Sequence, residues 1–272
     1  MSGNIFDPDE AARYYDDTST AEFYEKCWGG EDIHIGLYAT GQESVAEASA
    51  AMTRHLLENA GIAPGHRVLD IACGFGGTLR KLARSGCRAT GIDISNHCVN
   101  VARKANREAG LDDRIEVEVG DFHDIDSPPD KWDAVICQEA IIHSHNRPKV
   151  FAEAHRILRP GGVFAVSDIL TADKANVSRV EAAFARIGAS ADATIRDYQQ
   201  MAEEAGLVIE HAEERQSDIR AHYEKLADQL AQPNLDLDAD SVASISKSIS
   251  HWQAALANGD ITWVCFVARK PL

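Results

Sequence analysis

Short apolar runs alternate with helical patterns along residues 66–169. The runs, rich in β-branched residues, are HRVLDIACG, RATGIDIS, RIEVEVGD, WDAVICQEA and GGVFAVSDI. Between them lie the helical patterns GTLRKLARSG, NHCVNVARKANREAG and RPKVFAEAHRILRPGG. Strands that alternate with helices at this rhythm form βαβ units, in which helices cover both faces of a parallel sheet. The sequence therefore predicts an α/β fold with a mostly parallel sheet.

The rest of the chain predicts two further strands and a set of helices beside them. LVIEHAEE has a strand pattern, and DITWVCFVARK near the C-terminus is an apolar strand that should pair antiparallel with its neighbour. ESVAEASAAMTRHLLENAG has the period of one helical face and a plausible stop at Gly61. Helical patterns also interrupt the alternation at about 170–193 and 215–258. We expect an N-terminal helical lid segment over 1–60 and a domain over 61–272 that carries two lid insertions.

Composition excludes some classes of partner. The formal net charge is −16, and only nine of the 27 cationic residues are lysine. Nucleic acid and anionic membranes are bound through Lys and Arg that neutralise phosphates, so neither is an expected partner. No stretch reaches the roughly 20 apolar residues that cross a bilayer, and MSGNIFDPDE lacks a secretion signal, so we expect a cytoplasmic protein. The lysine-poor acidity fits either adaptation to salt or an ordinary acidic protein with a pI near 5.0.

The cysteines are scattered without a C-x-x-C pair, and several lie inside apolar runs. Zinc sites and disulfide frameworks have recognisable cysteine spacings, which this pattern lacks. We therefore expect buried, reduced thiols and no metal site. The residues concerned are Cys27, Cys73, Cys87, Cys98, Cys137 and Cys265.

The first apolar run leads into VLDIACGFGGT, a glycine turn between a strand and a helix. Asp70 closes the strand, Gly74 and Gly76 allow a tight turn, and the helix should begin at about Gly77. Such a turn lets a ligand approach the main chain at the carboxyl ends of the strands. The dinucleotide fingerprint G-x-G-x-x-G is incomplete, because Leu79 stands where its third glycine belongs. A nicotinamide cofactor is therefore disfavoured, and S-adenosylmethionine is the competing interpretation.

Polar side chains also end the next three strands, in chain order. Asp93 ends the second strand, where a carboxylate can accept hydrogen bonds from ribose hydroxyls. Asp121 and Phe122 end the third, where an acceptor and a ring can hold adenine, and Gln138 and Glu139 end the fourth. Taken singly, each acid is better explained as a helix N-cap. Together, each at a strand end, they indicate a cofactor cleft.

With these motifs the chain resembles the Class I S-adenosylmethionine-dependent methyltransferases over nearly its whole length. This implies a Rossmann-like, mostly parallel seven-stranded sheet with an antiparallel C-terminal strand and a helical lid. YYDD, WGGEDIHIGLY, EAIIHS and HWQAALANGDITW lie outside the generic cofactor motif and look like the sarcosine/dimethylglycine N-methyltransferases that make glycine betaine. More distantly, RYYDD, FYEKCWGG and EAIIHS are similar to segments of the phosphoethanolamine methyltransferases.

The resemblance implies methyl transfer from S-adenosyl-L-methionine to sarcosine and/or dimethylglycine. The alternatives are methylation of another small amine, phospho-base or natural-product nucleophile and, in other classes, a nicotinamide oxidoreductase or a cofactor-binding module without catalysis. Tyr15, with Tyr14 as its uncertain neighbour, and His143 are implied to close over the substrate amine. The residues implied to line the cofactor are Tyr24, Ile35, Gly36, Ala72, Gly74, Asp93, Ile94, Asp121, Phe122, Gln138 and His143.

The expected substrate is a small amine that carries a carboxylate. Arg186 in FARIGAS matches a substrate-anion arginine of the phosphoethanolamine family and can clamp a carboxylate through two hydrogen bonds, although it can also be a solvated helix residue. Aromatic faces favour the quaternary cation that forms, and Trp28, Tyr38 and Tyr198 are candidates. For Trp263, inside an apolar strand, a core position is the stronger interpretation.

His143 has two interpretations. The amine must lose a proton before it attacks, and an imidazole has an ordinary pKa suited to receiving a proton near neutrality. Alternatively, His143 only forms hydrogen bonds with Tyr15 or the lid. Sequence leaves this choice open, together with the number of methyl groups added and the oligomeric state.

Overall fold

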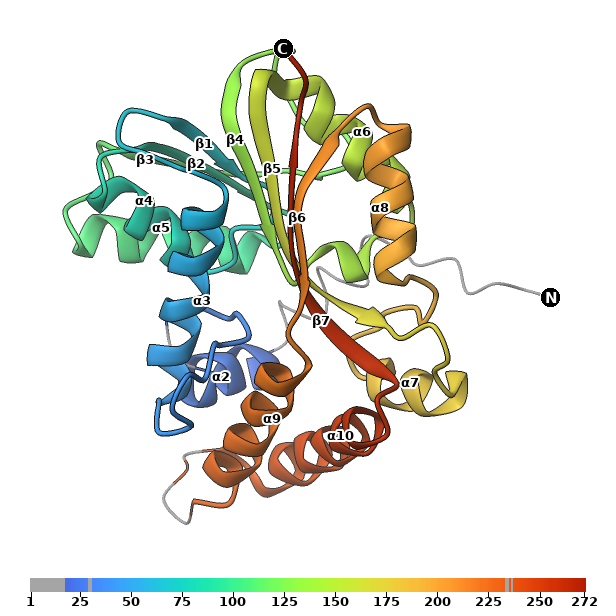
Figure 1. Cartoon of the computed structure of the whole chain (residues 1–272). Helices are drawn as coiled ribbons and strands as arrows, with labels where there is room; N and C mark the ends of the chain where they lie inside the picture. The colour runs from blue at the N-terminus through green and yellow to red at the C-terminus, as the bar shows by residue number, and fades with distance from the viewer. Residues whose placement is uncertain (1–17, 29–30, 233–234, 236) are drawn as a thin grey trace.

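A seven-stranded sheet forms the centre of the molecule (Figure 1). The computed structural model describes residues 18–28, 31–232, 235 and 237–272. The strand order is β3-β2-β1-β4-β5-β7-β6, and β7 is antiparallel to both of its neighbours whereas the other pairs are parallel. The predicted sheet with its antiparallel C-terminal strand is confirmed. The strands are β1 Arg67–Asp70, β2 Arg88–Asp93, β3 Ile115–Val119, β4 Trp132–Gln138, β5 Leu158–Thr171, β6 Val208–Glu214 and β7 Ile261–Arg269.

Helices cover both faces of the sheet (Figure 1). In β4, Ala134 and Ile136 pack into the core on one face, while Val135 and Cys137 pack into the core on the other. This two-sided burial explains why the strands have continuous apolar runs rather than alternating ones. On one face lie α3 Val45–Asn59, α4 Gly77–Arg84 and α5 Asn96–Glu108, and on the other lie α6 Arg147–Ile157 and α8 Ile195–Glu204.

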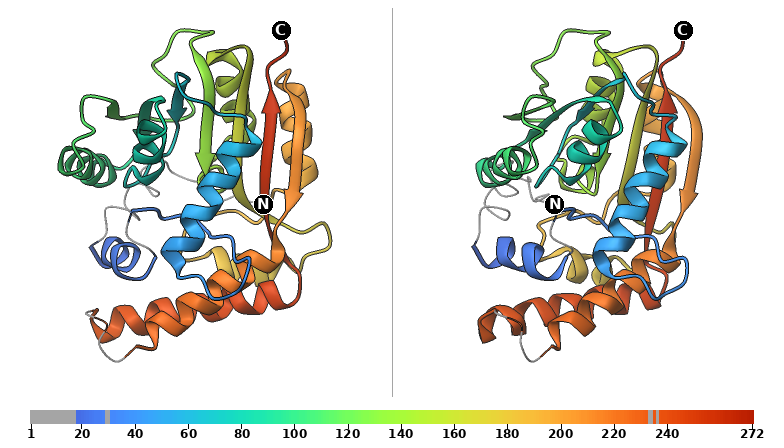
Figure 2. Two further views of the ribbon diagram at one scale, coloured as in Figure 1. Left: turned by 60° about the vertical axis from the view of Figure 1, so that its left-hand side comes forward. Right: turned by 90° about the vertical axis from the view of Figure 1, so that its left-hand side faces the viewer.

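The remaining helices gather at the carboxyl end of the parallel strands (Figures 1 and 2). Residue Thr171, the last of β5, pairs with Ile261, the first of β7, so the segments that follow β5 and precede β7 leave the sheet together. We call these helices the helical layer: α2 Thr18–Cys27, α7 Val177–Phe184, α9 Gln216–Leu230 and α10 Ala239–Ala257. None of the helices in the described ranges combines the length and apolar composition that a membrane crossing needs.

Segment 31–38 is held between α3 and α9. Gly36 lies against α3 so closely that an added Cβ would fall 2.3 Å from the Cβ of Ala48. The backbone N–H of Gly36 and the hydroxyl of Tyr38 both contact Nδ1 of His222 on α9, at 3.2 and 2.9 Å. The backbone N–H of Tyr38 donates to Asp218 Oδ1 at 2.8 Å. This segment therefore ties the helical layer to the helix that covers the sheet.

All six cysteines are buried free thiols, as predicted. The predicted helix before Gly61 is also confirmed, because α3 buries Val45, Ala48, Met52 and Leu56 and ends at Asn59. Trp263 is fully buried in β7, which confirms its core position.

The burial of His222 makes stability depend on pH. Burial lowers the pKa of His222 to about 3, against about 6.5 in an unfolded chain. Because the folded-state pKa is the lower one, the unfolded chain binds the proton more tightly. The contribution of His222 is therefore present above about pH 6.5 and is lost as the pH falls towards 3.

We predict that the free energy of unfolding falls on acidification below about pH 6.5, with His222 contributing up to about 1.4 kcal/mol per pH unit. Urea denaturation at several pH values should show a shallower slope for His222→Asn than for the wild type. His251→Asn, on α10, is the control for the effect of a histidine-to-asparagine replacement itself. Equal slopes for the wild type and His222→Asn would contradict the prediction.

Candidate active site

A cavity that opens to solvent lies where the carboxyl ends of β1, β2, β3 and β4 meet. We call it the strand-end cavity. Its lining comes from the turns that follow these strands and from segment 31–38. Eight residues that the sequence predicted line it together: Ala72, Gly74, Asp93, Ile94, Asp121, Phe122, Gln138 and His143.

The glycine turn forms one wall of the strand-end cavity. Gly74 adopts a φ of +49°, a conformation that favours glycine, and an added Cβ would lie 3.1 Å from Cδ1 of Ile33. The carboxylate of Asp93 holds the turn, since it accepts hydrogen bonds from the N–H of Gly74 and of Ser95, both at 2.9 Å.

Gly77, at the start of α4, has a role that the sequence did not reveal. An added Cβ would fall 2.0 Å from Oδ1 of Asp32, so only glycine lets segment 31–38 lie over this helix start. An ion pair between Asp32 and Lys81 of α4 fixes the contact. As a result, Ile33 and His34 reach the strand-end cavity.

Asp121 is oriented by a histidine two residues later. Oδ1 accepts hydrogen bonds from the backbone N–H of His123 at 2.8 Å and contacts its Nδ1 at 2.7 Å. His123 Nε2 in turn lies 2.7 Å from the hydroxyl of Ser144. Both contacts with Asp121 from the described residues use Oδ1, which leaves Oδ2 for a ligand.

Gln138 presents its amide group to the cavity. The hydroxyl of Thr78 donates to Gln138 Oε1 at 3.0 Å, which orients the side chain. Within the described ranges, Gln138 Nε2 is buried and has no hydrogen-bond partner. A buried donor left unpaired costs about 1–3 kcal/mol, so this group favours a ligand that offers an acceptor.

Glu139 follows with a strained backbone at a φ of +48°. Its Oε1 accepts a hydrogen bond from Trp263 Nε1 at 2.8 Å, and its Oε2 lies 3.3 Å from His34 Nδ1. Burial alone would lower the pKa of His34, but the hydrogen bond and charge of Glu139 outweigh burial and raise it. The cavity wall thus holds a paired histidine and carboxyl group.

His143 closes the short 3-10 helix Ile141–His143 after β4. Burial, reinforced by the positive charge of Arg147, lowers the pKa of His143 to about 4. A hydrogen bond with the backbone of Ile187 partly opposes this shift. The imidazole is therefore neutral near neutral pH, which corrects the expectation of an ordinary pKa at this position.

A second pocket lies within the helical layer. The rings of Tyr223 and Trp252 stack at 4.7 Å, and Trp28 meets Tyr223 edge-on at 6.3 Å. The guanidinium of Arg186 lies 5.7 Å from the centre of the Phe23 ring. We call it the aromatic pocket, and it is lined by Phe23, Tyr24, Trp28, Arg186, Ile187, Tyr223, Ile245, Ser248, Ile249 and Trp252.

The two pockets are neighbours. His143 lines the strand-end cavity, and the Ile187 backbone to which it hydrogen-bonds belongs to the lining of the aromatic pocket. A second link joins Trp28 to His34, since Trp28 Nε1 donates to the His34 carbonyl at 3.1 Å.

Some predicted residues lie elsewhere. Tyr15 and Tyr14 lie outside the described residues. The structure does not bring Ile35, Gly36, Tyr38 or Tyr198 into either pocket. Ile35 packs in the core, Gly36 lies against α3, and Tyr38 contacts His222, whereas Tyr198 is fully buried beside α6 and donates its hydroxyl to Asp168 at 2.5 Å.

Several lining residues were missed at the sequence level. Ile33 and His34 stand in the WGGEDIHIGLY stretch that carries the resemblance, next to the residues that were chosen. Glu139 was recognised as a strand end but was not assigned to the site. His123 and His145, whose rings lie 4.2 Å apart in the cavity wall, had no signal other than proximity to predicted residues.

The fold and the ordered strand-end side chains together define a Class I methyltransferase. Residues 62–226 match a family model described as a methyltransferase domain. The chain is 34% identical over 274 residues to dimethylglycine N-methyltransferase from Parasynechococcus marenigrum (strain WH8102), covering 96% of this chain and 95% of the relative. It is 31% identical over 281 residues to sarcosine/dimethylglycine N-methyltransferase from Aphanothece halophytica, covering 96% and 97% of the two chains.

Similarity extends to a solved structure. A candidate sarcosine dimethylglycine methyltransferase from Galdieria sulphuraria superimposes with a TM-score of 0.87 at 30% identity, covering 95% of this chain and 99% of that one. The chain belongs to the family of sarcosine/dimethylglycine N-methyltransferases, as its sequence motifs predicted.

Proposed function

We propose that the protein methylates sarcosine and/or dimethylglycine with S-adenosyl-L-methionine, which produces dimethylglycine and glycine betaine. The observation that carries this proposal is the contact between the strand-end cavity and the aromatic pocket at His143 and Ile187. The strand-end cavity offers carboxylates and an amide that can bind a nucleoside. The aromatic pocket combines aromatic rings with an arginine. The names of the relatives support the same substrates.

The strand-end cavity fits S-adenosyl-L-methionine. Its wall offers the carboxylate of Asp93 for the ribose hydroxyls and Asp121 Oδ2 for the adenine amino group, with Phe122 beside it. The buried Gln138 Nε2 is a hydrogen-bond donor without a partner among the described residues. Because Gly74 has no side chain, a ligand can approach its backbone closely. When bound, the cofactor supplies an electrophilic methyl group for in-line displacement by the amine.

The aromatic pocket fits the methyl acceptor. A guanidinium binds a carboxylate through two parallel hydrogen bonds, a role that Arg186 can fill at the pocket wall. The rings of Trp28, Tyr223 and Trp252 offer faces and edges to methylated nitrogen, and a desolvated cation on an aromatic face gains about 2 kcal/mol. As the amine becomes quaternary its charge is fixed, so this attraction acts on the product as well.

His143 acts in this proposal by position. A neutral imidazole between the two pockets can accept a hydrogen bond from the substrate amine, but a pKa of about 4 makes it a weak proton acceptor near neutrality. Orientation of two reactants can lower a barrier by roughly 7–11 kcal/mol, more than the roughly 10²–10⁴-fold of general base catalysis. Tyr15 remains the proposed partner of His143 at the amine.

The helical layer is the proposed lid. Helix α7 falls within the expected insertion 170–193, and α9 and α10 fall within 215–258, while α2 belongs to the expected segment 1–60. Closure of these helices over the strand-end cavity would exclude water from the reacting atoms. We also propose that neither nucleic acid nor a membrane is a partner, on the strength of the net charge of −16.

The acceptor specificity is tested by incubating the purified protein and S-adenosyl-L-methionine with glycine, sarcosine, dimethylglycine or phosphoethanolamine. Mass spectrometry should detect methylated products from sarcosine and/or dimethylglycine and none from phosphoethanolamine. One buried methyl group contributes only about 0.8 kcal/mol, or about fourfold in affinity. We therefore expect the rates for glycine, sarcosine and dimethylglycine to differ only modestly. Methylation of phosphoethanolamine alone, or of no acceptor, would contradict the proposal.

Arg186→Lys should raise the KM for dimethylglycine about 10–100-fold and change kcat much less, because a bidentate contact with a carboxylate is lost. The matched control is Arg179→Lys. Arg179 lies on α7 and pairs with Asp260 at 2.5 Å, outside the aromatic pocket, so its replacement should leave KM near the wild-type value. An unchanged KM in Arg186→Lys would assign the carboxylate to another residue.

His143→Ala should lower kcat/KM for sarcosine while keeping the shape of the pH–rate profile above about pH 6, because the neutral imidazole does not titrate there. His143→Asn, which retains a hydrogen-bonding group, should recover part of the lost rate. A wild-type profile with an ionisation near neutrality that His143→Ala lacks would instead make His143 the general base.

A further inference from the structure

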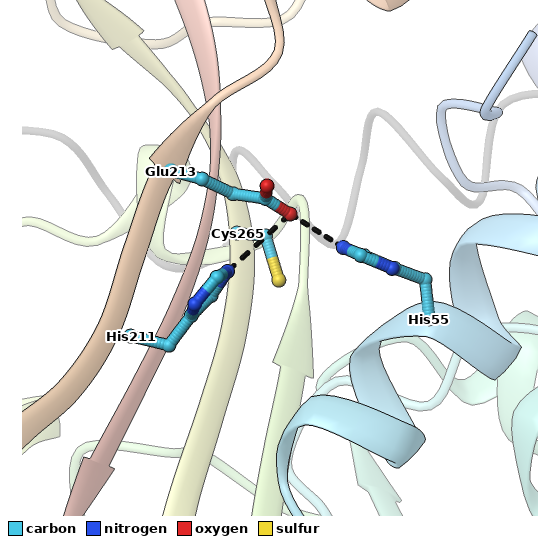
Figure 3. Close-up of side chains that lie close together, drawn as sticks. All are labelled: His55, His211, Glu213 and Cys265. Atoms are coloured by element: carbon cyan, nitrogen blue, oxygen red, sulfur yellow. Dashed lines mark hydrogen bonds and ion pairs between the residues drawn. The ribbon is translucent and has the colours of Figure 1, made fainter.

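Four potential metal ligands converge beside the C-terminal half of α3. His55 lies on α3, His211 and Glu213 lie on β6, and Cys265 lies on β7 (Figure 3). Each residue offers one ligand atom, and these four atoms all lie within 4.8 Å of one another. None of the four lines the strand-end cavity or the aromatic pocket. The cluster is therefore separate from the proposed methylation site.

The side chains point toward one another. Glu213 Oε1 contacts His55 Nε2 and lies 3.4 Å from His211 Nε2, and the sulfur of Cys265 points into the space between the two histidines (Figure 3). His211 Nε2 is buried and, in the described part of the chain, makes no hydrogen bond of good geometry. Two imidazoles, a carboxylate and a thiol thus face a shared centre.

The spacing fits a tetrahedral ion after small side-chain rotations. Zinc binds nitrogen and oxygen at about 2.0–2.2 Å and sulfur at about 2.3 Å, so its ligands stand roughly 3.3–3.6 Å apart. The ligand atoms of the cluster lie within 4.8 Å of one another, so the largest distance between them must shorten by little more than about 1 Å to reach this spacing. The contact of 3.4 Å between His211 Nε2 and Glu213 Oε1 already has the required value.

The chemical types of the four ligands indicate which metal ion the cluster binds. Thiolate and imidazole favour borderline and soft metals, whereas magnesium and calcium prefer sets made of oxygen alone. Four protein ligands that leave no open position are typical of structural rather than catalytic zinc. We propose that His55, His211, Glu213 and Cys265 form a structural Zn²⁺ site that joins α3 to the outer strands of the sheet.

Arg215 competes with the metal for this cluster. Its guanidinium Nε lies 3.2 Å from Glu213 Oε1, and Nη2 lies 3.3 Å from His55 Nε2. Nη1 is also 3.8 Å from Asp218 Oδ2, which offers the guanidinium a second carboxylate. Binding of the ion requires Arg215 to turn from Glu213 toward Asp218, so loss of the guanidinium favours the metal.

Asn59 stands beside two of the ligands. Its Nδ2 lies 3.0 Å from His55 Nε2 and 3.9 Å from Cys265 Sγ. When the metal takes the lone pair of His55, this amide is free to donate to the thiolate, the kind of outer contact that orients a ligand.

The ion would fix the position of α3. Helix α3 carries Ala48, the surface against which Gly36 packs, and β7 carries Trp263, which hydrogen-bonds Glu139 in the strand-end cavity. A link between α3 and β7 therefore stabilises the helix against which segment 31–38 packs and the strand that holds Glu139. The effect is on stability, and methyl transfer itself does not use the ion.

The test titrates tag-free, chelator-treated full-length protein with Co²⁺, a spectroscopic substitute for Zn²⁺. We expect one equivalent to give a sulfur-to-cobalt charge-transfer band and the strong visible bands of tetrahedral cobalt, and Zn²⁺ to abolish both. His55→Ala and His211→Ala should weaken binding at least about 100-fold, since even outer contacts change metal affinity about 10–100-fold. Arg215→Ala should tighten it, and Zn²⁺ should raise the Tm of the wild type but not of His211→Ala.

His251→Ala, on α10, is the matched control and should bind cobalt like the wild type. Cys265→Ser should remove the charge-transfer band, and because this residue is buried, the half-exposed His211 provides the independent variant if the serine protein fails to fold. Absence of a thiolate band in the wild type would overturn the site. Wild-type affinity in both histidine variants would overturn it equally.

Discussion

The reversal of strand order between β1 and β4 is the constraint on which the site depends. From β1 the chain adds β2 and β3 on one side, and it then crosses to add β4 and β5 on the other. The segments after β1 and β4 therefore leave the sheet in opposite directions and open a crevice between them, where open α/β sheets bind ligands. Because the strands are parallel, Asp93, Asp121 and Gln138 all reach this crevice from successive strand ends.

Around this crevice the N-terminal segment connects the sheet to the helical layer. Asp32 contacts Lys81 in the last turn of α4, and Gly36 and Tyr38 contact His222 on α9. His34, between these anchors, reaches Glu139 in the cavity. The same short segment thus lies against the glycine turn at Gly74, the carboxylate of Glu139 and the proposed lid.

Sequence predicted the parts of the fold and site that local pattern encodes. The strand and helix runs, the turn at Gly74 and the acids at the strand ends are each visible within a few residues, and the topology then brings them together. The resemblance implied that Ile35 and Gly36 line the cofactor, whereas Ile33 and His34 are the residues of this segment that line the strand-end cavity. Gly36 instead packs against α3, a contact that sequence does not report.

Other features arise only from contacts between distant residues. Tyr198 seemed available for a cation by residue type alone, but its hydroxyl is committed to the buried Asp168. The low pKa of His143 results from burial and from Arg147, neither of which a sequence pattern reports. The cluster of His55, His211, Glu213 and Cys265 joins three separate elements, so the spacing of the cysteines gave no sign of it.

The central claim is that the strand-end cavity and the aromatic pocket form one methylation site. A crystal structure of the protein with S-adenosyl-L-homocysteine and dimethylglycine tests it most directly. The account predicts the nucleoside beside Asp93 and Asp121, the carboxylate of dimethylglycine at Arg186, and its nitrogen facing the sulfur past His143. Dimethylglycine bound away from the contact of the two pockets, or a nucleoside outside the strand-end cavity, would contradict the account.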